Sequence, residues 1–219
     1  MTYDMTTHKS FLIKDVTKSF DLNNNIVRFL ESRGVLQKLE LLLKESRNDP
    51  FADVLTPALI KFFGNIAHLR PKQMIVQHTG FLDCLLEMTD SNDLVHKVVA
   101  FETIGYIGVS LEGKTTLNDL GNKFANSLDK LENLVQDAPT ELRIRGMNAF
   151  ASLVKLDKEN QRPEMLAITE AWFSCGLGSK PLGLLAGLVR QPFPELRLAA
   201  YQILANIAKQ GTKYGLKLD

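Results

Sequence analysis

The sequence predicts an all-α protein, a right-handed α-solenoid of about four to five stacked repeats. Three observations lead to this prediction. One amphipathic helix, Pro194–Gln210, recurs in related form at three earlier places in the chain. No stretch of convincing length alternates apolar and polar residues as a half-buried strand would. Hydrophobic residues make up 45% and aromatic residues 8% of the chain, a composition typical of helices packed by leucine and alanine.

The helix 194–210 defines the repeated pattern. Its apolar residues recur three, four, seven, eight and eleven positions after the first, so they share one helix face. Pro194 and Glu195 suit a first turn, which needs no N–H from its first residue and favours negative charge. Gly211 is expected to end the helix. The apolar face consists of Leu196, Ala199, Ala200, Ile203, Leu204 and Ile207.

The four related helices align at one short motif, which begins at residues 64, 105, 151 and 205 and reads GNIA, GYIG, ASLV and ANIA. The mean step of about 47 residues matches armadillo and HEAT arrays, whose units contain two or three helices. Such units stack because one unit cannot bury its own apolar face. Thr56 and Pro57 are expected to begin the first long helix as N-cap and first helical residue. The expected long helices are 59–68, 94–109, 141–156 and 194–210, and 35–45 and 81–88 are expected second helices of units.

Charge and chain ends limit the class of protein. Lys and Arg number 26 and Asp and Glu number 25, a net charge of +1 that gives no attraction to nucleic acid or to an anionic membrane. Residues 1–10 are polar and are expected to be a disordered leader, and residues 11–219 a single repeat domain within a longer array. Neither a signal peptide nor an apolar run of membrane-spanning length is apparent, which predicts a cytoplasmic protein, with the nucleus as a second compartment.

No residue pattern suggests catalysis or metal binding. Cys84 and Cys175 lie far apart in helical patterns and are expected to be buried thiols. The histidines lack the spacing of metal ligands, and no serine or cysteine nucleophile is paired with a histidine in a recognisable pattern. Trp172 and Phe173 are expected in the core. We therefore expect no catalytic residue, cofactor, metal or small-molecule substrate.

The segment Gly108–Thr115, GVSLEGKT, fits the pattern G-x-x-x-x-G-K-T of phosphate-binding loops. Such a loop follows a strand and opens a helix, so that its N–H groups face the phosphates. Here the preceding residues match the helical repeat, which favours a turn between stacked units with Gly113 ending that region. The less favoured alternative is a nucleotide-binding enzyme that uses Gly113, Lys114 and Thr115.

One repeated position on the long helices is a candidate for partner binding. It directly follows the first residue of each motif and holds Asn65, Tyr106, Ser152 and Asn206. In armadillo arrays that bind extended peptides, an asparagine at this place hydrogen-bonds the peptide backbone, and a tryptophan lies one turn earlier. Lys61 occupies that earlier position here, so a generic peptide groove is disfavoured.

A second repeated position, near the helix starts, holds Lys97, Arg143 and Arg197. These cations can bind an acidic partner, or each can link its own helix start to the next unit. The second interpretation is favoured, because most charge pairs at repeat seams are structural or weak. Arg145 has no equivalent cation in the other repeats, which makes it the better candidate for a surface contact.

Three segments resemble one known family: LTPALIKFFGNIA at 55–67, ITEAWFS at 168–174 and QPFPELRLAA at 191–200. They are similar to the 26S proteasome non-ATPase regulatory subunit 5 family, and the resemblance covers roughly residues 50–210. It implies an armadillo/HEAT-like assembly chaperone of the proteasome regulatory particle, which holds the C-terminal domains of ATPase subunits of the base and is absent from the finished proteasome. The alternative is a general armadillo/HEAT scaffold that binds another protein or peptide.

Overall fold

The computed structural model describes residues 25–46, 52–155, 168, 185 and 187–214, and within these ranges it contains helices and no strand. The chain divides into two compact units, residues 1–42 and 43–219. None of the helices in the described ranges is both long and apolar enough to cross a bilayer. The expectations for the leader and for Trp172, Phe173 and Cys175 fall outside these ranges, and a single domain over residues 11–219 stays a prediction.

In the first unit, residues 25–32 are helical, and the chain turns at Gly34 before the next helix. Gly34 has φ of 65°, in the left-handed region that glycine adopts without the steric cost of a Cβ atom. Helix α2 (Val35–Glu45) begins directly after it, with the bounds that the sequence predicts. Val27 and Leu36 are the buried apolar residues on either side of this turn.

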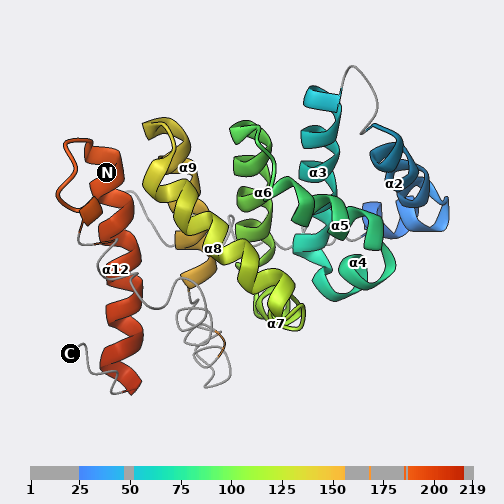
Figure 1. The fold of residues 1–219 in the computed structure, drawn as a ribbon. Helices are drawn as coiled ribbons and strands as arrows, with labels where there is room; N and C mark the ends of the chain where they lie inside the picture. Colours follow the sequence, from blue (N-terminus) through green and yellow to red (C-terminus); the bar gives the residue numbers. More distant parts are fainter. Residues whose placement is uncertain (1–24, 47–51, 156–167, 169–184, 186, 215–219) are drawn as a thin grey trace, which may run out of the picture. The chain divides into compact units, whose positions relative to one another are not determined.

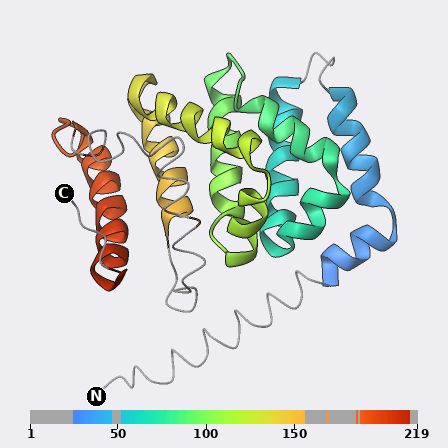
Figure 2. The same cartoon turned by 60° about the horizontal axis from the view of Figure 1, so that its bottom comes forward.

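In the second unit, four long helices lie side by side in chain order, as Figures 1 and 2 show. They are α3 (Ala52–Leu69), α6 (Leu94–Ile107), α9 (Thr140–Val154) and α12 (Pro194–Tyr214). Each carries one copy of the repeated motif, and α3 packs on α6, α6 on α9 and α9 on α12. The prediction of an all-α solenoid is therefore confirmed.

Shorter helices complete the units. Helices α4 (Pro71–Gln77) and α5 (Thr79–Met88) precede α6, and α7 (Leu111–Asn118) and α8 (Asn122–Asp137) precede α9. Helix α4 packs on α7 and α5 on α8, so each kind of helix stacks on the equivalent helix of the neighbouring unit. The two repeats that are described completely thus have three helices each, which is the armadillo arrangement. The sequence period alone allowed either two or three helices in each repeat.

Aromatic residues fill the core of the row. Phe63, Phe101 and Phe150 lie on successive long helices and are at most 1% exposed, and burying each contributes roughly 1.5–3 kcal/mol. The first residue of the motif sets how closely the helices approach. A Cβ atom at Gly105 would lie 2.9 Å from the Cα atom of Ala149, so only glycine permits this contact between α6 and α9.

Two predicted helix ends are wrong by more than two residues. Helix α3 begins at Ala52, so Pro57 lies inside it and Thr56 is not its N-cap. The Thr56 hydroxyl instead shares a hydrogen bond of 2.9 Å with the hydroxyl of Ser46. Helix α12 continues through Gly211 to Tyr214, because a single helical glycine costs only about 1 kcal/mol relative to alanine.

Candidate functional site

The segment that resembles a phosphate-binding loop is mostly helical. Gly108 caps the end of α6, and the Ser110 side chain caps the start of α7 by accepting a hydrogen bond of 3.0 Å from the N–H of Gly113. Helix α7 then includes Gly113, Lys114 and Thr115. The expectation that Gly113 ends a region is wrong, because Ser110 begins a new helix three residues before it.

Gly113 and Lys114 of this motif have packing roles. A Cβ atom at residue 113 would clash with the carbonyl oxygen of Ile107, so glycine lets α7 approach the end of α6. The Lys114 side chain is fully buried, and its Nζ atom donates a hydrogen bond to the carbonyl oxygen of Leu153 on α9. A phosphate-binding lysine must reach a ligand beside the loop. This arrangement therefore does not fit a phosphate site.

The candidate partner-binding residues Asn65 and Tyr106 come together at a groove between α3 and α6. The groove has a volume of about 190 Å³, and both side chains are exposed. Ser152 takes the equivalent place on α9, where its hydroxyl donates to the carbonyl of Asn148 over 3.0 Å. We call the exposed side of α3, α6 and α9 that carries Asn65, Tyr106 and Ser152 the ladder face. The groove is lined by Lys61, Gly64, Asn65, Glu102, Thr103 and Tyr106.

Tyr106 is held in place by His68 of the preceding long helix. The two rings stack with centroids 4.1 Å apart and planes at 18°. The Nδ1 atom of His68 lies 2.9 Å from the carbonyl oxygen of Tyr106, and since a carbonyl only accepts, Nδ1 is the donor. Tyr106 nevertheless remains 44% exposed. It is a supported aromatic side chain, which loses little conformational freedom when a partner covers it.

Arg145 is engaged by Glu102 across the seam between α9 and α6. Its Nε and Nη2 atoms donate hydrogen bonds to the two carboxylate oxygens, each over 2.6 Å. This hydrogen bonding raises the pKa of Arg145 further, against the opposing effect of partial burial. The side chains are 34% and 33% exposed. Arg145 is therefore one half of a bidentate ion pair that borders the groove, whereas the sequence suggested a candidate for contact with a partner.

Arg143 and Arg197 bind backbone carbonyls that precede their own helices. The Nε atom of Arg143 donates to Val135, in the last turn of α8, over 2.8 Å. Arg197 donates to the carbonyls of Gln191 and Pro192 over 2.9 and 3.1 Å. We expected these cations to link their helix starts to the next unit, and for Arg143 and Arg197 this is wrong, because each binds carbonyls that precede its own helix. Carbonyls at a helix end lack helical partners and carry partial negative charge, which attracts a cation.

The remaining candidates give less information. Lys97 is half-buried near the start of α6, and no hydrogen bond or ion pair of its side chain is found within the described ranges. Asn206 lies in α12, but its side chain is outside the described part. Glu102 and His68 were missed from sequence. Glu102 lies one turn before Tyr106, so the helical spacing could have pointed to it.

Cys84 is buried, as expected. Within the described ranges, no group of three or more histidine, cysteine, aspartate or glutamate side chains is placed to hold a metal ion.

Comparison with known proteins supplies the family. The model of the family described as "Proteasome non-ATPase 26S subunit" matches residues 16–216. The chain belongs to this family. The human 26S proteasome non-ATPase regulatory subunit 5 is 36% identical to this chain over 184 residues, and the bovine protein is 38% identical. Each match covers 84% of this chain and 36% of the relative, so the chain spans about a third of the length of these proteins.

Solved structures support the fold of this family member. A designed armadillo repeat protein in complex with the peptide (KR)4 has a TM-score of 0.60 at 21% identity, covering 84% of this chain and 68% of the designed one. An engineered protein has a TM-score of 0.52 at 16% identity, covering 95% of each chain. At such identities the similarity shows the armadillo-like fold alone.

Proposed function

We propose that this chain is a non-catalytic assembly chaperone for the base of the 26S proteasome regulatory particle. In this proposal it binds the C-terminal domains of ATPase subunits during assembly, in the cytoplasm and also in the nucleus. The observation that carries the proposal is family membership, since the matched relatives are regulatory subunits that are themselves named non-ATPase.

The ladder face is the surface that we assign to the partner. Tyr106 offers an exposed aromatic side chain with His68 stacked on it, and polar Asn65 and Lys61 surround it. Tyrosine anchors with polar neighbours are typical of the residues that dominate protein interfaces. The charge of Glu102 is matched by Arg145, so this face is not acidic, and we do not expect it to select a strongly basic peptide such as (KR)4.

Titration calorimetry of the purified chain against isolated ATPase C-terminal domains tests the proposal. We expect a complex at tens of micromolar or tighter, which Tyr106→Ala weakens by roughly tenfold or more, as loss of a central aromatic anchor does. The control is Tyr201→Ala, which removes a similarly exposed tyrosine from α12, outside the ladder face, and should leave binding unchanged. Absence of any complex, with the chain shown to be folded, would refute the function. If Tyr106→Ala binds as tightly as the unchanged chain, only the assignment of the partner to the ladder face is refuted.

The non-catalytic part of the proposal has its own test. Because the Lys114 side chain is buried against Leu153, we expect millimolar Mg-ATP to leave the thermal unfolding midpoint unchanged. A ligand present at a hundred times its Kd would stabilise the chain by about 2.7 kcal/mol and raise the midpoint by several degrees. Such a rise would favour the nucleotide-binding alternative.

A further inference from the structure

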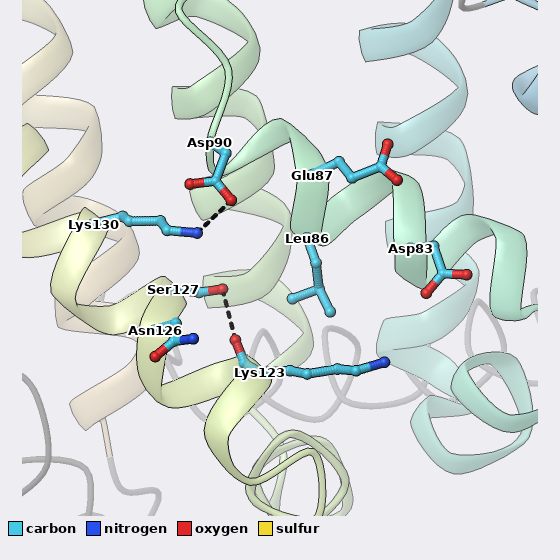
Figure 3. A pocket seen from close by; sticks show the side chains of 8 residues that line it. All are labelled: Asp83, Leu86, Glu87, Asp90, Lys123, Asn126, Ser127 and Lys130. Atoms are coloured by element: carbon cyan, nitrogen blue, oxygen red, sulfur yellow. Dashed lines mark hydrogen bonds and ion pairs between the residues drawn. The ribbon is translucent and has the colours of Figure 1, made fainter.

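A second groove lies between α5 and α8, away from the ladder face, and Figure 3 shows it from close by. Its volume is about 280 Å³. We call it the outer groove. Helix α5 and the turn after it contribute Asp83, Leu86, Glu87 and Asp90, and α8 contributes Lys123 and Lys130 among others.

The two walls of the outer groove carry opposite charges. The α5 side has three carboxylates, and the α8 side has two ammonium groups. At one end, Lys130 Nζ lies 2.5 Å from Asp90 Oδ2, so these two charges compensate each other. Elsewhere in the groove, Asp83 and Lys123 are exposed, and neither forms an ion pair with another residue of the described ranges.

The spacing of these side chains is helical. Asp83 and Glu87 are one turn apart on α5, and Lys123 and Lys130 are two turns apart on α8 with Ser127 between them. Side chains four residues apart on a helix are neighbours on its surface. A third helix lying along the groove can therefore place side chains that are one turn apart opposite side chains that are one turn apart on α5 or α8. Leu86 is half-buried and, in the view of Figure 3, points into the space above the Lys123 side chain, which gives such a helix an apolar contact.

We propose that the outer groove docks a surface helix of a protein partner in which a carboxylate lies one turn from a lysine or arginine. The cation would face Asp83, and the carboxylate would face Lys123. A helix of one charge sign would be repelled by one of the walls, so mixed charge gives selectivity. The groove is open and polar, unlike the largely apolar, enclosed pockets that hold small ligands. This proposal does not depend on the function proposed above.

The helical peptide (EAAAK)4 is a probe with this charge pattern, and backbone amide NMR of the full chain reports where it binds. At low salt we expect shifts confined to α5 and α8. Lys123→Glu should weaken binding roughly fivefold, the effect of losing an exposed charge pair and creating a repulsion. Lys72→Glu is the matched control, because Lys72 is an exposed lysine of α4 outside the groove. It should leave the affinity for the peptide unchanged.

Several outcomes would overturn the proposal. One is the absence of shifts on α5 and α8 at millimolar peptide. Another is equal weakening by Lys72→Glu, which would mean attraction to net charge alone. A third is tighter binding of (EAAAE)4 or (KAAAK)4, which would mean that the groove selects one sign of charge. Circular dichroism checks that Lys123→Glu is folded. We expect it to be folded because Lys123 is exposed.

Discussion

The residue type at some positions of this protein is explained by the atoms that lie next to it in the fold. Lys114 is the clearest case, because a buried ammonium group needs a partner, and the carbonyl of Leu153 provides one near the end of α9. Gly113 is a second case, because α7 meets the end of α6 where a side chain has no room. Gly113 and Lys114, which suggest nucleotide binding, thus serve the packing of α6, α7 and α9.

The close approach at Gly113 leads to a stability prediction. Gly113→Ala should lower the free energy of unfolding by about 1–3 kcal/mol or more, because the added methyl group must displace backbone. Chemical denaturation measures this loss. Gly187→Ala is the control, because a Cβ atom there has no atom within 4 Å, and it should be neutral or stabilising by up to about 1 kcal/mol. Equal effects of the two substitutions would contradict the packing argument.

The long helices are alike in sequence but differ in what covers them. Four residues before each motif stand Ile60, Phe101, Met147 and Tyr201. The first three are at most 1% exposed and lie on helices that pack on a following helix of the row, whereas Tyr201 is 56% exposed. Leu198, one turn earlier on α12, is 60% exposed. The same position in the repeat therefore belongs to the core in α9 and to the surface in α12.

This difference predicts opposite results for similar truncations. Met147→Ala should cost about 2–5 kcal/mol of unfolding free energy, because it leaves a cavity between helices. Tyr201→Ala should cost less than about 1 kcal/mol, since most of its ring is already in water. Thermal and urea unfolding of both variants check this. A large loss for Tyr201→Ala would show that α12 is covered on that side in solution.

At the scale of the whole second unit, stability depends on the interfaces between adjacent helices. Helix α6 packs between α3 and α9, and each helix of the row contacts chiefly those beside it. In such arrays the free energy is close to a sum of unit and interface contributions. The ion pair of Glu102 with Arg145 joins α6 to α9, and the hydrogen bond from His68 to Tyr106 joins α3 to α6.

This organisation predicts a gradient in hydrogen exchange. Amides of α6 should exchange at least about tenfold more slowly than those of α12, because opening α6 breaks two interfaces of the row. Exchange monitored by mass spectrometry at neutral pH measures the difference. Uniform protection across the row would indicate that the second unit opens only as a whole.

The sequence by itself determined the features that depend on local periodicity. Apolar spacing is repeated every helical turn, so the helices and the repeat were predictable, and the bounds of α2 were correct. The family was predicted from the resemblance of three short segments, which periodicity alone does not identify. Only the tertiary structure decided which side chains meet. Glu102 and Arg145 are 43 residues apart, and Lys114 and Leu153 are 39 apart. The first contact depends on how one repeat packs on the next, and the second depends on how the helices of one repeat pack together. That geometry arises from packing over many residues, and no short stretch of sequence contains it.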